Sequence, residues 1–207
     1  MDIFRLDILR HGETELSHTL RGSTDDALTA KGWQHMQQTI ETELSLYGVS
    51  SQPLWDVIVS SELQRCRLFA FELSEKLMLP LQVNPQFQEM HFGDWEAVDT
   101  QQIYAQSPEL LTQFWEKPTQ FAPPNAETMQ QFQQRVVFGL DSLIQQVQEH
   151  QWQRVLLISH GGVIKLLKCL ALQQPLDDIL KMSAELGQLN SFIIHSSNKI
   201  SLLEQNK

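Results

Sequence analysis

The sequence predicts an α/β fold: a three-layer α/β/α sandwich with a mostly parallel central sheet and one antiparallel edge. Short apolar runs rich in Val, Ile and Leu alternate with longer segments whose apolar residues recur at helical spacing. This alternation is typical of parallel sheets covered by helices on both faces. It stops near the C-terminus, where two strand-like runs, 191–195 and 200–203, flank a polar turn at 196–199. Such a pattern predicts an antiparallel hairpin at the edge of the sheet.

The first half of the chain alternates between strand and helix. An apolar run at 3–9 suits the first strand, and Gly12 begins a polar loop to Asp26 that is a candidate wall of a site. The helix predicted over 29–46 has four apolar residues at helical spacing, Trp33, Met36, Ile40 and Leu44. The next predicted elements are a strand at 55–60, a helix at 63–77 and a short strand at 81–83.

Prolines interrupt the second half. Residues 85–95 are predicted to be irregular, and 100–115 to form one helix. Pro118, Pro123 and Pro124 then break the helical pattern and mark a connector or lid. The last predicted elements before the hairpin are a helix at 128–150, a strand at 155–159 and a helix at 163–172.

Length and charge bound the class of protein. With 207 residues and 42% hydrophobic content, the chain is expected to form a single domain, 1–207, with a full core. The net charge of −10 argues against nucleic acid and anionic membranes as partners, because the long-range field repels both. A phosphate-binding pocket must then be locally basic. No run approaches the roughly 20 apolar residues of a membrane span and no signal-peptide pattern is present, so a cytoplasmic location is expected. The oligomeric state is not indicated.

The two cysteines, Cys66 and Cys169, are predicted to be reduced and partly buried. They are too few for a disulfide framework, and no cysteine or histidine stands near them at zinc-site spacing. The sequence therefore shows no metal-ligand pattern.

Two histidines follow apolar strands and precede glycines: His11 within Arg10-His11-Gly12, and His160 before Gly161-Gly162. Because open α/β sheets bind ligands at the carboxyl ends of parallel strands, we expect both histidines at one site. Arg10 supplies a planar fork of donors suited to phosphate, and a neutral imidazole is a nucleophile that can accept a phosphoryl group. The glycines either turn the chain or let a phosphate approach the amides of the next helix. The pattern indicates phosphoryl chemistry.

Two further residues complete this hypothesis. Arg65, one turn into the helix after the second strand, is placed to form a two-arginine clamp with Arg10, although an arginine at such a position is more often a helix-surface cation. Glu89 follows the third strand and suits a general acid that protonates a departing alkoxide. Asp94 and Glu96 stand nearby and are expected to be solvated or to cap a helix.

Four motifs in order resemble those of the histidine phosphatase superfamily, which includes cofactor-dependent phosphoglycerate mutase. They are Leu9-Arg10-His11-Gly12-Glu13-Thr14, Ser60-Ser61 with Leu63 and Arg65, Glu89 with Phe92-Gly93-Asp94-Trp95-Glu96, and Ser159-His160-Gly161-Gly162. The resemblance covers nearly the whole chain and implies a phosphoglycerate mutase-like fold.

The resemblance also implies roles for individual residues. His11 matches the nucleophile that becomes phosphorylated, and Glu89 matches the acid that protonates the leaving group and then activates water. Arg10, Arg65 and His160 match the pocket that holds the phosphoryl oxygens. Members of the family need no metal or other cofactor, so none is expected, and the expected partner is a small phosphorylated substrate.

Within the family, the chain most resembles the α-ribazole phosphatase group, which removes a 5′-phosphate during assembly of the cobalamin nucleotide loop. Only residues 97–124 separate the Glu89 region from the segment before the last long helix, where mutases usually carry a longer insertion. A short cover favours hydrolysis over return of the phosphoryl group. The loop at 20–29 resembles a substrate-contacting segment. Ser17, Arg21, Gly22 and Gly161 are the predicted substrate-binding residues.

Several departures and alternatives accompany this prediction. Ser17 replaces a common asparagine, Ala97 a common glycine, and Asn125-Ala126 a common glycine pair, which bears on the substrate more than on the chemistry. The alternatives are a general small-molecule phosphatase, a phosphoglycerate mutase, and a module that binds or dephosphorylates phosphoproteins. Trp95, Trp115 and Phe121 either line the rim of a site or fill the core, and we expect the core.

Overall fold

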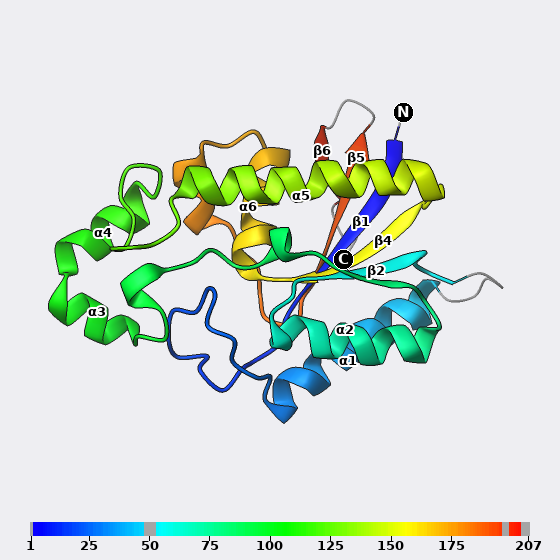
Figure 1. The fold of residues 1–207 in the computed structure, drawn as a ribbon, viewed down its shortest axis with the longest axis horizontal. Coiled ribbons are helices and arrows are strands. Elements are labelled where there is room, and N and C mark those ends of the chain that lie inside the picture. The colour runs from blue at the N-terminus through cyan, green and yellow to red at the C-terminus, as the bar shows by residue number, and fades with distance from the viewer. Residues whose placement is uncertain (1, 48–52, 196–198, 204–207) are drawn as a thin grey trace.

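One mixed sheet organises the chain in the computed structural model, which describes residues 2–47, 53–195 and 199–203. Within these residues the sheet has six strands in the order β3-β2-β4-β1-β5-β6 (Figure 1). The first four in this order are parallel, β5 is antiparallel to β1, and β6 is antiparallel to β5. The strands are β1 (Asp2–Arg10), β2 (Val57–Ser60), β3 (Leu81–Val83), β4 (Arg154–Ser159), β5 (Leu189–His195) and β6 (Ile200–Leu203). The predicted fold class is confirmed.

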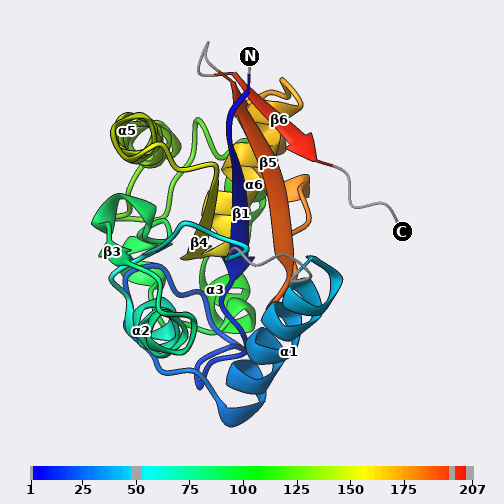
Figure 2. The same cartoon turned by 90° about the vertical axis from the view of Figure 1, so that its right-hand side faces the viewer.

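Helices cover both faces of the sheet (Figure 1 and Figure 2). On one face, α1 (Ala30–Tyr47) and α2 (Gln64–Leu77) pack on side chains such as Leu9. On the other face, α5 (Met129–His150) and α6 (Gly161–Ala171) pack on the alternate side chains of the same strand, including Ile8. The central strands carry apolar side chains on both faces because helices cover both faces. Within the described residues, no helix is long and apolar enough to cross a membrane.

The segment predicted as one helix over 100–115 is two helices, so that prediction is wrong. α3 (Thr100–Gln106) ends before Ser107, and α4 (Pro108–Glu116) begins at the proline. Ser107 has φ −146° and ψ 58°, outside the helical region, because a proline disfavours helical geometry in the residue before it. The proline itself suits the first position of α4, where its missing N–H costs nothing.

Smaller differences concern irregular segments and boundaries. Residues 85–95 contain two 3₁₀ turns, η1 (Pro85–Phe87) and η2 (Gly93–Trp95), and a third, η3 (Leu176–Lys181), was not predicted. α6 starts two residues earlier than expected. The antiparallel β5–β6 hairpin is confirmed, while most of its predicted turn, 196–198, lies outside the described residues. Both cysteines are free and fully buried.

The register of the parallel strands brings the two histidine motifs together. Arg10 is paired with Ser159 across β1 and β4, so the residue that follows each strand emerges at the same edge of the sheet. Ser60 at the end of β2 pairs with Ile158 of β4 at that edge. The carboxyl ends of three neighbouring strands therefore deliver polar side chains to one place, as open α/β sheets do.

Candidate active site

His11 and His160 lie side by side, with ring centroids 5.3 Å apart at an angle of 60°. The Nδ1 of His11 is 2.8 Å from the carbonyl oxygen of Gly12. Because a carbonyl only accepts, Nδ1 carries the proton and Nε2 keeps its lone pair. Burial, followed by the charges of Arg65 and Arg10, holds the pKa of His11 well below its ordinary value. The imidazole is therefore neutral and nucleophilic at Nε2.

His160 is held from both sides by protein groups. Its Nδ1 accepts from Nε of Arg65 at 3.3 Å, so Nε2 carries the proton and donates to Oγ of Ser61 at 2.8 Å. Burial and the charge of Arg65 lower the pKa of His160 well below its ordinary value. Cys66 also approaches this ring, with Sγ 3.6 Å from Nε2, and burial raises the pKa of its thiol to about 12.

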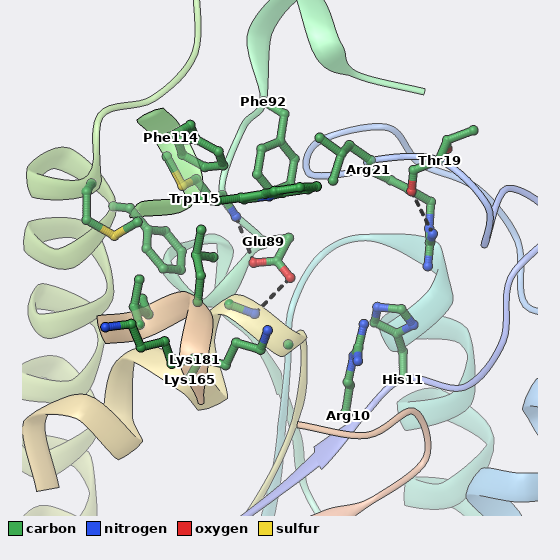
Figure 3. A pocket seen from close by; sticks show the side chains of 18 residues that line it. Arg10, His11, Thr19, Arg21, Glu89, Phe92, Phe114, Trp115, Lys165 and Lys181 are labelled. Atoms are coloured by element: carbon green, nitrogen blue, oxygen red, sulfur yellow. Dashed lines mark hydrogen bonds between the residues drawn. The ribbon is translucent and has the colours of Figure 1, made fainter. Parts of the chain in front are cut away.

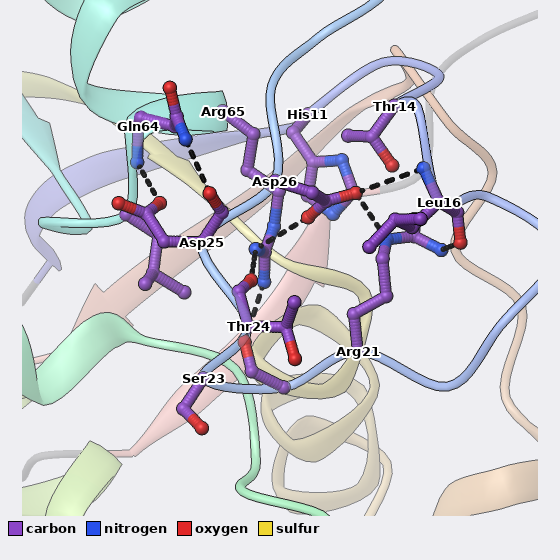
Figure 4. A network of polar contacts seen from close by, with 12 residues as sticks. His11, Thr14, Leu16, Arg21, Ser23, Thr24, Asp25, Asp26, Gln64 and Arg65 are labelled. Carbon is purple, nitrogen blue, oxygen red and sulfur yellow. Dashed lines mark hydrogen bonds and ion pairs between the residues drawn. The ribbon is translucent and has the colours of Figure 1, made fainter. Parts of the chain in front are cut away.

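Arg65 is fully buried, with 1% of its surface exposed, and is not the surface cation that its position alone suggested. It donates to the carbonyls of Thr24 and Gly22 at 2.6 and 2.7 Å, and to Oδ1 of Asp26 at 3.1 Å. The other carboxylate oxygen of Asp26 pairs with Arg21 at 3.1 Å. Asp26 thus links two arginines and fixes the loop that surrounds His11 (Figure 4).

Arg10 has an unused hydrogen-bond donor at the pocket. Its Nη1 donates to the carbonyl of Ala184 at 2.5 Å, while its buried Nε has no hydrogen-bond partner among the described residues. Gly161 makes room for this group, since a Cβ there would lie 3.0 Å from Cζ of Arg10. An unpaired, buried guanidinium donor at the edge of a pocket suits an anionic ligand.

Glu89 holds its carboxylate against two backbone amides. Oε2 accepts from the N–H of Gly162 at 2.9 Å, and Oε1 accepts from the N–H of Met90 at 3.0 Å. Any side chain at 162 would overlap Glu89 Oε1, so this glycine makes room for the carboxylate. The amide of Gly162 therefore binds the candidate acid, and not a phosphate as one reading of the glycine pair suggested.

These groups open onto a pocket of about 450 Å³ with one polar and one apolar end (Figure 3). The polar end is locally basic, as the acidic chain requires, and consists of Arg10, His11, Arg21, Glu89 and Lys165. Lys181 lines the pocket on the side away from His11, where it pairs with Asp178. The apolar end is formed by Phe92, Phe114, Trp115, Met129, Phe132, Ile179 and Leu180. Trp115 is 47% exposed at this end, so its prediction as a core residue is wrong, whereas Trp95 is buried as expected.

Seven of the predicted site residues lie in the pocket or are buried directly around it. Arg10, His11, Glu89, Arg21 and Gly161 line the pocket. The other two, Arg65 and His160, are fully buried and hydrogen-bonded to each other. The ring of His160 also lies against that of His11.

The other two predicted substrate-binding residues make contacts within the protein. The amide of Gly22 donates to Glu96 at 3.0 Å. The exposed Ser17 accepts from the N–H of Thr14 at 2.9 Å.

The prediction of a solvated or helix-capping side chain is wrong for Glu96, which anchors the loop at 22–24. Asp99, and not Glu96, caps the following helix α3. The carboxylate of Glu96 accepts from the amides of Gly22, Ser23, Thr24 and Phe92 and from the hydroxyl of Thr24. Burial raises the pKa of Glu96, but these hydrogen bonds outweigh burial and lower it overall. The exposed Asp94 accepts from the side-chain amide of Asn125 at 3.0 Å.

Sequence reasoning missed charged residues of the site, among them Asp26 and Lys165. Lys165 lies four residues after Gly161 on α6, so helical spacing placed it on the same face, and this signal was available. Burial lowers the pKa of Lys165, and the nearby Glu89 partly offsets that effect. Nothing local in the sequence marked Asp26 as a partner of Arg65. Within the described residues, no three His, Cys, Asp or Glu side chains gather as a metal site would require.

Comparison with known proteins gives consistent matches over most of the chain. The family model of the histidine phosphatase superfamily (branch 1) matches residues 6–206. An adenosylcobalamin/α-ribazole phosphatase of Escherichia coli (strain K12) is 32% identical over 79% of this chain and 76% of its own. The crystal structure of the α-ribazole phosphatase from Shigella flexneri is 27% identical and superposes with a TM-score of 0.80, covering 99% of this chain and 96% of its own. A mycobacterial glucosyl-3-phosphoglycerate phosphatase is 27% identical with a TM-score of 0.79, covering 96% and 95%.

Proposed function

The chain belongs to the histidine phosphatase superfamily (branch 1), and we propose that it hydrolyses phosphomonoesters through a phosphohistidine formed on His11. The observation that carries this proposal is the neutral His11 in the pocket, with its Nδ1 proton bound by Gly12 and its Nε2 lone pair free. We propose that residues 1–207 act as one domain and need no metal or other cofactor for this reaction.

In the first step, Nε2 of His11 attacks the phosphorus and the bond from phosphorus to the alcohol oxygen breaks. Glu89, in its protonated form, gives its proton to that oxygen, so the alcohol leaves neutral. The unpaired Nε–H of Arg10 offsets negative charge on the phosphoryl oxygens, and Arg21 adds a second cation at the pocket wall.

Arg65 and His160 support the same step from their buried positions. The charge of Arg65 disfavours protonation of His11 and so keeps the nucleophile available. For His160 to donate to a phosphoryl oxygen, its Nε2–H must leave Ser61, to which it donates in the structure. We propose that this exchange of partners accompanies substrate binding.

In the second step, water attacks the phosphorus of phospho-His11. The carboxylate of Glu89, which lost its proton in the first step, takes one from the water, and the bond between phosphorus and Nε2 breaks. Inorganic phosphate leaves, His11 regains its lone pair, and Glu89 is protonated again. Protons and charge balance over the two steps without a further reactant.

The substrate we favour is α-ribazole 5′-phosphate. Both the E. coli relative and the S. flexneri structure carry α-ribazole phosphatase in their names. The apolar end of the pocket, with Phe92 and Trp115, suits the flat aromatic base of such a nucleotide. A second candidate is a phosphomonoester whose alcohol part is anionic, because Lys165 lines the same pocket. The mycobacterial glucosyl-3-phosphoglycerate phosphatase is a relative named for a substrate of that kind.

The test measures phosphate release in the presence of a metal chelator, with wild type and His11→Ala. The esters are α-ribazole 5′-phosphate, glucosyl-3-phosphoglycerate and 3-phosphoglycerate. We expect release from one preferred ester, loss of release in the variant, and an acid-labile phosphorylated wild type on rapid quenching. Release that persists in His11→Ala would contradict the mechanism. A preference for another ester would reassign the substrate and leave the mechanism in place.

A further inference from the structure

Arg135 of α5 holds the backbone that carries Glu89. Its Nη1 donates to the carbonyls of Gln86 and Gln88 at 2.8 and 3.2 Å, and its Nη2 donates to the carbonyl of Glu89 at 3.2 Å. These three carbonyls belong to the irregular segment after β3, which has no strand or α-helix to fix it. One guanidinium therefore fixes three points of the segment.

The remaining donors of Arg135 bind Glu127. Nε donates to Oε1 at 2.9 Å and Nη2 donates to Oε2 at 2.8 Å, an arrangement that also balances the charge. All five N–H groups of the guanidinium are thus engaged, and a lysine, with three donors on a flexible stem, cannot reproduce them. The side chain is only 23% exposed.

α5 lies close enough for these bonds because of Gly139, one helical turn after Arg135. A Cβ at 139 would lie 2.7 Å from Cβ of Gln86, so a larger residue would move the helix away from η1. The guanidinium also lies over the ring of Phe132, 5.2 Å from its centroid, and Phe132 lines the pocket. The contacts between α5 and the Glu89 segment therefore extend to the pocket wall.

The peptide group that links Glu89 to Met90 connects Arg135 to the carboxylate. The carbonyl of this peptide accepts from Nη2 of Arg135, and its N–H donates to Oε1 of Glu89. A rotation of that peptide would break both bonds. We infer that Arg135, braced by Glu127, is a positioning residue that sets the orientation of the Glu89 carboxyl for proton transfer to the leaving group. This inference rests on the proposed acid role of Glu89.

The experiment compares esters that differ in their need for a proton donor. An alkyl phosphate requires protonation of its leaving oxygen, whereas 2,4-dinitrophenyl phosphate releases a stable phenolate without it. For Arg135→Gln we expect kcat/KM to fall about 10- to 100-fold with the alkyl phosphate and less than about threefold with the dinitrophenyl ester. This ratio covers the steps up to release of the alcohol and leaves out the later attack of water, which both esters share. Arg135→Lys is expected to restore part of the loss. Glu127→Gln, a milder change, is expected to show the same selectivity in case Arg135→Gln does not fold.

Two comparisons separate positioning from a merely structural role. In a Glu89→Gln background, Arg135→Gln is expected to cause little further loss with the alkyl ester, because the group it positions is already gone. Arg154→Gln removes a different, partly buried arginine that bonds Asp7 at 2.5 Å and is expected to affect both esters equally.

Equal loss of both esters in Arg135→Gln, or full additivity with Glu89→Gln, would overturn the inference. If Glu89→Gln itself fails to discriminate between the esters, the acid role of Glu89 is wrong, and the inference falls with it.

Discussion

Asp7 and Arg10 lie three residues apart on β1. The Asp7 carboxylate has several hydrogen-bond partners within the protein, whereas Arg10 keeps a donor without one. The carboxylate of Asp7 is fully buried and accepts from four donors: Nε of Arg5 at 2.8 Å, Nε of Arg154 at 2.5 Å, Nε1 of Trp55 at 2.8 Å and Oγ of Ser191 at 2.5 Å. Arg10 lines the pocket with a buried Nε that has no hydrogen-bond partner among the described residues.

The difference shows how one strand serves two purposes. A buried charge that is fully bonded stabilises one packing arrangement, and removal of one partner leaves the others unsatisfied. A buried donor without a partner costs stability in the free protein and is compensated when a ligand supplies the acceptor. We therefore expect changes around Asp7 to affect folding, and changes around Arg10 and His11 to affect catalysis.

The largest effect on activity is expected from His11→Ala. Loss of the nucleophile should lower kcat by about 10⁴-fold or more. The free energy of unfolding should change by no more than about 1 kcal/mol, because truncation enlarges an existing pocket and leaves no closed cavity. Phosphate release and urea denaturation of the same preparation measure both quantities. A destabilised but active variant would contradict the division between the two regions.

Asp7→Ala is expected to give the opposite result. It leaves two arginines without their common carboxylate, so we expect a loss of about 3–5 kcal/mol in the free energy of unfolding. The value of kcat per folded molecule should stay within about twofold of wild type, because the variant retains every pocket residue. Denaturation curves and active-site titration check this. A large fall in kcat with unchanged stability would show that the two regions are coupled.

The local patterns of the sequence predicted which residues stand at the strand ends. They did not predict the long-range contacts that hold those residues in place. Arg10, His11, Glu89 and Gly161 reach the pocket because each stands at or just after an element that apolar periodicity identifies. That signal is contained within a few residues.

Contacts between distant segments were not predictable in this way. Glu96 binds the amide of Gly22 across 74 positions, and Asp26 bonds Arg65 across 39. The burial of Arg65 likewise depends on the conformation of the loop that carries Gly22 and Thr24, whereas the break at Ser107 had a local signal in Pro108. Hydrophobic periodicity carries no information about such loops.

An acid-dependent loss of stability should come from the two site histidines. Burial lowers the pKa of both His11 and His160 in the folded state, so the unfolded chain binds protons first as the pH falls below about 6.5. The free energy of unfolding therefore keeps its full value above that pH. Below it, the free energy of unfolding falls by up to about 1.4 kcal/mol per pH unit for each histidine. In His11→Gln, the slope of the unfolding free energy against pH should be smaller by up to about 1.4 kcal/mol per pH unit between pH 6.5 and 5, which corresponds to one proton. Urea denaturation at several pH values measures this slope. An unchanged slope would contradict neutral burial of His11.

Lys165→Met is expected to have the smallest effect, and that effect should depend on the substrate. Methionine keeps much of the length of the side chain and removes the charge, so the apolar contacts of the pocket remain. If Lys165 binds an anionic alcohol part, KM for glucosyl-3-phosphoglycerate should rise about tenfold, equivalent to about 1.4 kcal/mol, with KM for α-ribazole 5′-phosphate within about twofold of wild type. Steady-state kinetics with both esters measure the ratio. An equal rise for both would show that Lys165 acts on the phosphoryl group common to them, and would place it with Arg10 as part of the anion site that the Asp7 region lacks.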